Sequence, residues 1–199
     1  MNELSDHLDA IKVKPRFGEE KFHKNGEQLP FSILGYWQWS GSDLLNNAAR
    51  GILAEYIVAC DLGVTDQARV EWDACDLVTK SGIKVEVKSA AYLQSWKQSK
   101  SSAITFSIAP TYGWDAKTNE SGKIKARQAE VYVFCLLSHK DKATVDPIDV
   151  AQWRFFLLTT KVLNEKVGQQ KSISLNSLLK LKPIETAFGN IGNSIEKLL

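Results

Sequence analysis

Apolar and polar residues alternate most clearly over residues 83–88. The apolar members are Ile83, Val85 and Val87, and the polar members are Lys84, Glu86 and Lys88. Successive side chains of a strand point to opposite faces, so this pattern predicts a strand with one apolar face and one charged face. A second β-prone run starts near Asp76, and the Ser81-Gly82 pair between the runs is typical of a hairpin turn. We therefore expect a hairpin that brings Asp76 beside Glu86.

Helical spacing of apolar residues precedes this hairpin, over residues 43–62. The apolar positions are Leu45, Ala48, Ala49, Ile52, Leu53, Tyr56, Ile57 and Cys60. Ser42 or Asp43 is expected to cap the start of the helix, and Gly63 supplies a stop. Glu55 lies at the edge of the apolar stripe, where a carboxylate needs water, a partner or a metal ion.

Other segments complete a pattern of mixed strands and helices. Strands are expected at 68–72, 76–79, 103–108, 129–137 and 153–160, and helices at 160–167, within 173–181 (after a short strand, capped by Asn176 or Ser177) and at 191–199. The run 129–137 is nearly all apolar, as in a strand covered on both faces. Residues 110–128 are rich in Gly, Lys, Asn and Ser and predict a surface loop.

The first 40 residues differ in character from the rest. Residues 1–30 are polar and predict a solvated arm, with contact to a phosphate backbone as the alternative. Its basic residues are Lys12, Lys14, Arg16, Lys21 and Lys24. Residues 31–39 are dense in aromatic side chains, and we expect them to pack over the core rather than stack on bases.

Composition narrows the class of protein without naming an activity. The 199 residues fit one domain, and the net charge of +2 neither requires nor opposes nucleic-acid binding. Cys60, Cys75 and Cys135 form no disulfide or zinc spacing, so we expect buried thiols in a reducing compartment. With no signal pattern and no apolar run long enough for a membrane span, the expected location is cytoplasmic.

The charged face of the hairpin is suited to a metal ion and a phosphate. Carboxylate oxygens from Asp76 and Glu86 are typical Mg²⁺ ligands, and the Val87 carbonyl could add another. Lys88 would orient or deprotonate a water molecule, or stabilise charge on phosphate. Glu55 could complete the ligand set. The alternative is a solvated face of alternating charge, and Asp73 competes with Asp76 for the metal role.

These residues together resemble the PD-(D/E)XK nuclease superfamily. The resemblance covers about residues 43–137 and maps the helix acid to Glu55, the hairpin acid to Asp76, and the acid-x-lysine pair to Glu86 and Lys88. It implies an α/β, restriction endonuclease-like core, with a mixed central β-sheet flanked by helices in the order αβββαβ. In this chain Cys75 stands where such proteins often have a proline.

The resemblance also implies a substrate and contacts to it. It implies a Mg²⁺-dependent nuclease acting on DNA, with Mn²⁺ as a substitute ion and a homodimer as a candidate state. Gln94 or Gln98 would supply the glutamine that often follows the lysine, and Arg127 is a candidate phosphate contact. The alternatives are a nucleic-acid-binding module without catalysis and a protein-interaction domain, because a fold alone does not decide a function.

Overall fold

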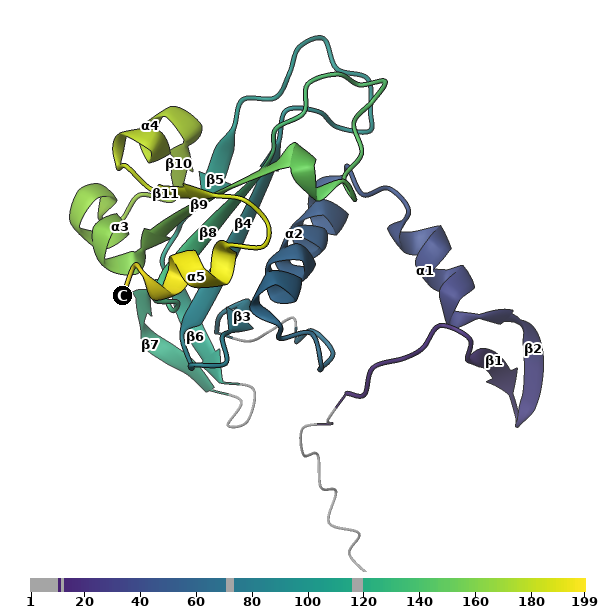
Figure 1. Ribbon diagram of the computed structural model, residues 1–199. Coiled ribbons are helices and arrows are strands. Elements are labelled where there is room, and N and C mark those ends of the chain that lie inside the picture. The colour runs from purple at the N-terminus through teal and green to yellow at the C-terminus, as the bar shows by residue number, and fades with distance from the viewer. Residues whose placement is uncertain (1–10, 12, 71–73, 116–119) are drawn as a thin grey trace, which may run out of the picture.

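A five-stranded sheet forms the centre of the molecule. The computed structural model describes residues 11, 13–70, 74–115 and 120–199 (Figure 1). The sheet has the strand order β11-β9-β8-β4-β3, with bounds β3 (Leu77–Val78), β4 (Lys84–Ala91), β8 (Val131–Leu137), β9 (Trp153–Thr159) and β11 (Ile184–Thr186). Strand β8 runs parallel to β4, and the other neighbours are antiparallel. The predicted mixed α/β architecture is therefore confirmed.

Each face of the sheet is covered by its own set of elements. Helices α2 (Asn47–Leu62) and α5 (Ile191–Glu196) cover one face, as Figure 1 shows. The other face packs against β5 (Thr105–Ser107), which pairs with β10 (Ser172–Ser174), and against α3 (Thr160–Val167) and α4 (Leu175–Lys180). Every side chain of β8 is buried as a result, which confirms the prediction of a doubly covered strand.

The expected loop at 110–128 is instead largely a hairpin. Strand β6 (Thr111–Asp115) pairs with β7 (Glu120–Ala126), and residues 116–119 lie outside the described part. All seven residues of β7 are exposed. A strand with no buried face carries no apolar alternation, so the sequence pattern gave no signal of it.

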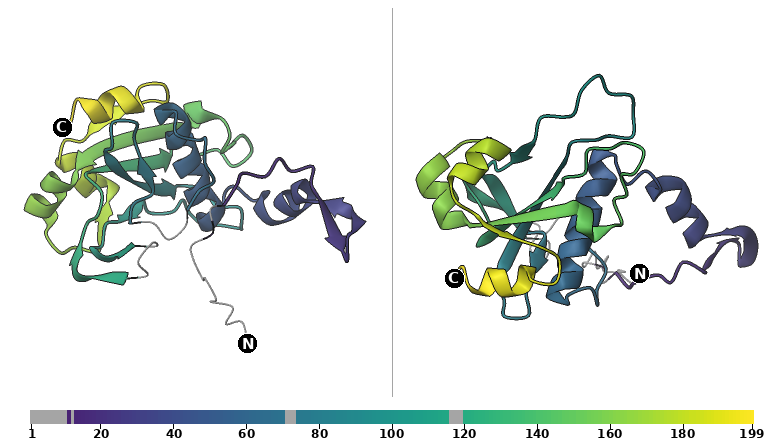
Figure 2. Two further views of the ribbon diagram at one scale, coloured as in Figure 1. Left: turned by 90° about the horizontal axis from the view of Figure 1, so that it is seen from below. Right: turned by 45° about the horizontal axis from the view of Figure 1, so that its top comes forward.

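The N-terminal segments project away from the sheet (Figure 2). Strands β1 (Lys21–Lys24) and β2 (Glu27–Ser32) form a hairpin, which α1 (Ile33–Gly41) follows directly. The arm is mostly exposed where it is described, as predicted, although Gly18 is buried, but the aromatic segment does not pack over the core. Helix α1 buries none of its residues, and Trp39 is 86% exposed.

Several predicted boundaries also need correction. Asn46 caps helix α2, because its side chain accepts a hydrogen bond from the main-chain N–H of Ala49. Asp43, one of the two predicted caps, instead accepts hydrogen bonds from main-chain N–H groups in the turn before the helix. Gly63 ends the helix at φ 63°, as expected. Residues 68–70 form no strand, and the rest of that prediction lies outside the described residues.

The order αβββαβ is matched only in part. Two strands, not three, lie between α2 and the connection that leads to β8 within the described ranges. That connection, described over 92–115 and 120–130, holds β5, β6 and β7 and no helix. A short 3₁₀ turn (Val150–Gln152) leads into β9, and the cap of α4 is Ser174 rather than Asn176 or Ser177. Cys75 and Cys135 are buried as predicted, but Cys60 is exposed.

Candidate active site

The β3–β4 hairpin forms in the predicted register. Leu77 pairs with Val85 and Val78 with Lys84, so Asp76 stands opposite Glu86 just beyond the last strand pair. The main-chain N–H of Gly82 closes the turn by donating a hydrogen bond of 3.0 Å to the carbonyl oxygen of Thr79. Gly82 has φ +92°, a conformation that favours glycine. The predicted Ser-Gly turn is therefore confirmed, and Asp76 lies near Glu86 as predicted, since both carboxylates approach Lys88.

Asp76 is fixed to β4 by a main-chain hydrogen bond. Its Oδ2 accepts the amide of Val87 at 2.7 Å. In a strand the N–H and C=O of one residue point to the same edge, so the Val87 carbonyl faces the Asp76 side of β4. The amide of Glu130 donates to the Lys84 carbonyl, which places the even-numbered carbonyls on the β8 side. A carboxylate and a main-chain carbonyl thus share the edge next to β3.

Lys88 lies between the two carboxylates. Its Nζ is 2.5 Å from Glu86 Oε1 and 4.0 Å from Asp76 Oδ2. The Lys88 side chain is 27% exposed, that of Glu86 is 20% exposed and that of Asp76 is 21% exposed. They are thus partly shielded from water while remaining open to a ligand.

The electrostatic balance of this cluster leaves negative charge in excess. Burial raises the pKa of the Glu86 carboxyl, and Asp76 raises it further, while Lys88 opposes both effects. Glu55 also raises the pKa of Glu86, by a smaller effect. One ammonium therefore does not neutralise two neighbouring carboxylates, and a further cation would relieve the repulsion. This donor set, rich in hard oxygen atoms, fits Mg²⁺ or Mn²⁺.

Glu55 stands nearby but has a partner of its own. Its carboxylate forms a bidentate ion pair with Arg69, through Nε to Oε2 and Nη2 to Oε1. Among the described residues, no group of three His, Cys, Asp or Glu side chains is arranged to hold a metal ion. The structure thus brings Asp76, Glu86 and Lys88 together and leaves Glu55 paired with an arginine. The alternative ligand Asp73 lies outside the described residues.

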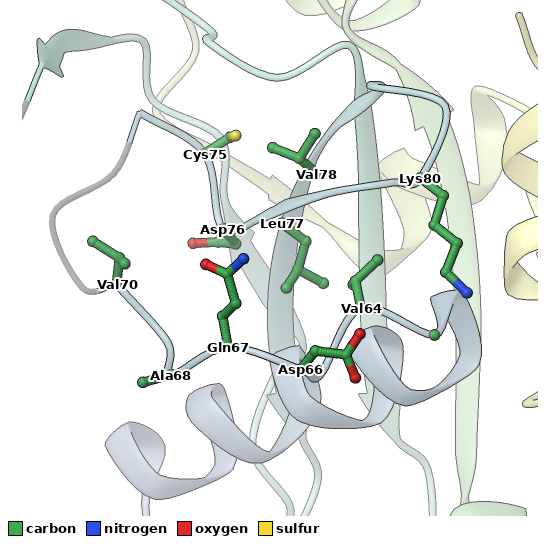
Figure 3. A pocket seen from close by; sticks show the side chains of 11 residues that line it. Val64, Asp66, Gln67, Ala68, Val70, Cys75, Asp76, Leu77, Val78 and Lys80 are labelled. Carbon is green, nitrogen blue, oxygen red and sulfur yellow. The ribbon is translucent and has the colours of Figure 1, made fainter. Parts of the chain in front are cut away.

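A groove of about 380 Å³ opens beside Asp76. It is lined by the loop that follows α2 and by residues 75–78 and Lys80. Figure 3 shows the Gln67 side-chain amide pointing toward the Asp76 carboxylate from that loop. The groove therefore gives one route by which a ligand can approach this carboxylate.

The three predicted substrate contacts have partners inside the protein. Gln98 Oε1 accepts a hydrogen bond of 2.7 Å from the main-chain N–H of Gln94, and Gln98 Nε2 donates to the Tyr92 carbonyl and to Ser102 Oγ. Gln94 is buried and contacts Arg50. Arg127 is also buried and donates to the Ile108 and Gln170 carbonyls and to Asn164 Oδ1. In this structure the side chains of Gln98 and Arg127 tie loops together, and their contact with substrate stays a prediction.

Comparison with protein families decides the broad activity. The family model for bacteriophage T4 endonuclease IV matches residues 8–177, which is most of the chain. The chain belongs to the bacteriophage T4 endonuclease IV family. It is therefore an endonuclease and a hydrolase. The match runs from before β1 into α4, so it includes the projecting N-terminal segments and every candidate site residue.

Two further observations accompany the assignment to the T4 endonuclease IV family. No curated protein sequence matches the chain significantly. None of the helices in the described ranges has both the length and the apolar character needed to cross a membrane.

Sequence reasoning missed the roles of two arginines, one on α2 and one in the loop that follows it. Arg69 lies in a segment that was expected to be a strand, and only the fold shows that it pairs with Glu55. Arg50 is buried on α2, on the same face as Ala54, Ile57 and Val58. Positions 50, 54, 57 and 58 follow the helical period, but an arginine at such a position is normally assigned to the surface, so the sequence gave no usable signal for its burial.

Proposed function

We propose that this endonuclease cleaves DNA by a metal-dependent reaction at the Asp76–Glu86–Lys88 cluster, in the manner of the PD-(D/E)XK nucleases. The observation that carries the proposal is the placement of Lys88 between two carboxylates that a hairpin brings face to face. Support for DNA as substrate comes from membership of an endonuclease family. The α2-β3-β4-β8 order supports the likeness of the core.

Asp76, Glu86 and the Val87 carbonyl would hold Mg²⁺, with Mn²⁺ as a substitute. When bound, such an ion would polarise the phosphodiester and lower the pKa of a bound water molecule. Asp76 contributes an oriented carboxylate, since its hydrogen bond to the Val87 amide fixes the side chain against β4. Glu55 would join the ligand set only by exchanging its ion pair with Arg69.

Lys88 supplies positive charge and proton donors at the reacting phosphate. Its ammonium has three donors, and Glu86 takes one of them at 2.5 Å. The remaining donors can orient the attacking water or stabilise charge that develops on the phosphate oxygens. Partial exposure of the side chain leaves this ammonium within reach of a substrate.

The first prediction tests metal dependence directly. The purified chain, stripped with EDTA, is expected to show no cleavage of DNA, and Mg²⁺ or Mn²⁺ is expected to restore it. Cleavage is followed on gels over single-stranded and duplex DNA and on matched RNA. Ca²⁺ serves as a control ion that has the same charge but different preferred geometry. Full cleavage in EDTA would contradict the metal-dependent assignment.

The second prediction separates the two roles of Asp76. Asp76→Ala and Asp76→Asn should both lose metal-dependent cleavage, but only Asp76→Ala should lose about 1–3 kcal/mol of unfolding free energy. The reason is that alanine leaves the Val87 amide without its acceptor, whereas the asparagine carbonyl replaces it. Urea unfolding followed by circular dichroism measures the difference. Equal stability of the two variants would show that this hydrogen bond contributes little.

A further inference from the structure

Arg50 is a buried cation held by neutral groups. It lies near the start of α2 and is 4% exposed. Its Nη1 donates to the Leu45 carbonyl at 2.8 Å and to Gln94 Oε1 at 3.2 Å, and its Nη2 donates to Asn47 Oδ1 at 2.7 Å. The Nε of Arg50 is buried and has no hydrogen-bond partner. Three of the five N–H donors of the guanidinium thus have partners, and the Nε–H is among those left over.

This arrangement is costly for the protein by itself. A buried charge is normally paired with an opposite charge, and a buried donor is normally hydrogen-bonded. The ion pairs found across the described residues include none to Arg50. Burial accordingly lowers the pKa of the Arg50 guanidinium. Both the net charge and the unused Nε–H would be satisfied by an anion from outside the chain.

Arg50 is one of the residues that line a polar cavity of about 300 Å³. Hydroxyl and amide side chains line it together with Arg50, namely those of Asn47, Ser89, Gln94, Ser102 and Thr105. The cavity also lies at the N-terminal end of the 16-residue α2, where the helix dipole favours negative charge. Its lining includes no acidic residue. Its donors and its charge therefore match a phosphate.

The cavity is next to the proposed reaction centre. Ser89 and Ala90 line it, and they follow Lys88 directly on β4. Lys88 points to the face of the sheet that β5, α3 and α4 cover, whereas Arg50 comes from α2 on the other face, so the two side chains lie on either side of β4. A substrate strand with one phosphate at Lys88 would reach Arg50 by passing around the edge of β4 beyond its pairs with β3 at Lys84 and Val85.

We propose that the Arg50 cavity binds a backbone phosphate of the substrate, close to the phosphate that is cleaved. This inference rests on the proposed function, because it uses Lys88 to mark the scissile position. Nε–H and an adjacent Nη–H of the planar guanidinium form a fork that suits two phosphate oxygens. Gln94 acts as a positioning residue that holds the guanidinium through Oε1. A contact of this kind fixes the register of the strand without reading its bases.

The proposal is tested by binding rather than by cleavage. A Lys88→Met chain in EDTA is titrated with a fluorescent oligonucleotide over a range of salt concentrations. Adding Arg50→Gln should weaken binding about tenfold or more, since hydrogen bonds to charged groups are lost. The slope of log affinity against log salt should fall by about 1. Arg50→Lys, which keeps the charge but not the fork, should retain most of the slope and lose part of the affinity.

A matched control comes from the other buried arginine. Arg127 is 7% exposed, and its Nε, Nη1 and Nη2 all donate to internal acceptors. Arg127→Gln should therefore lower stability while leaving the salt slope unchanged. An unchanged slope and affinity in a folded Arg50→Gln chain would overturn the proposal.

A second measurement uses the unsubstituted chain and so does not depend on the folding of a variant. The Nε–H resonance of Arg50, observed in a ¹⁵N-correlated spectrum, should move on addition of inorganic phosphate and of the oligonucleotide in EDTA. A resonance that moves with neither ligand would overturn the proposed phosphate site. The two proposals fail separately. Unchanged cleavage by the Glu86→Gln chain would contradict the proposed reaction centre without affecting the phosphate-binding result at Arg50. An Arg50 that does not respond to phosphate or oligonucleotide would contradict the phosphate site without affecting the evidence for metal-dependent cleavage.

Discussion

Replacement of Lys88 by methionine is expected to lower the rate of DNA cleavage by about 10²- to 10⁴-fold, the range for loss of a positioned proton donor or acceptor. Lys88 Nζ is held at 2.5 Å from Glu86 and 4.0 Å from Asp76, so its charge lies where a phosphate would meet these carboxylates. Methionine keeps the length and apolar character of the stem while removing the ammonium. The rate is measured under single-turnover conditions with saturating Mg²⁺.

Lys84 provides the matched control for this substitution. It lies on the same strand and the same face as Lys88, but it is exposed and outside the carboxylate cluster. Lys84→Met should change the cleavage rate by no more than a few fold. A comparable loss in the two variants would mean that general positive charge on β4, rather than the position of Lys88, supports the reaction.

The hairpin was predictable because its local signals agree with one another. Strict alternation over 83–88 fixed which side chains share a face, and Gly82 fixed the turn. A slip of one residue would have moved Val85 and Val87 out of the core, where they are now fully or nearly fully buried. The register of Leu77 against Val85, and with it the placement of Asp76 near Glu86, therefore followed from short-range pattern.

Which side of α2 is buried could not be predicted in the same way. The apolar stripe read from the sequence included Ile52 and Tyr56, yet these are 50% and 59% exposed. The buried face instead carries Arg50 together with Ala54 and Ile57. Pattern reasoning assigns an arginine to the surface, and only the tertiary arrangement shows that this one is enclosed. The same limit applies to Glu55, whose partner Arg69 is 14 residues away.

Exposed elements gave the remaining errors. Strand β7 has no buried side chain, and α1 has none either, so neither carries the contrast from which elements are predicted. Aromatic density at 31–39 indicated burial, but Tyr36, Trp37 and Trp39 remain largely in contact with solvent. Composition predicts burial only on average, since much of any protein surface is apolar.

Glu86→Gln is expected to change activity and stability in opposite directions. Loss of a charged metal ligand should lower Mg²⁺-dependent cleavage by about 10²-fold or more, because metal stabilisation of charge is worth several kcal/mol. Stability should rise at neutral pH in EDTA. Burial and the neighbouring Asp76 raise the pKa of Glu86, which means that the folded chain resists the loss of this proton more than the unfolded chain does.

The difference in stability between the Glu86→Gln variant and the unsubstituted chain should depend on pH. Below the ordinary pKa of 4.5 the carboxyl is protonated in both states, so Glu86→Gln and the unsubstituted chain should have the same melting temperature. As pH rises past the ordinary value and through the raised one, ionisation costs more in the folded state, and the variant becomes the more stable. Thermal unfolding in EDTA from pH 4 to 8 measures the difference.

Glu185→Gln is the control, since Glu185 is 49% exposed and pairs with Arg154 on the far side of the sheet from β3. It should show neither the gain in stability nor the loss of cleavage. A Glu86→Gln chain that is less stable than the unsubstituted chain at pH 8 would mean that the Lys88 ion pair outweighs burial and repulsion. The two carboxylates would then be stabilised by Lys88 alone, and the electrostatic argument for an additional cation at this site would fail.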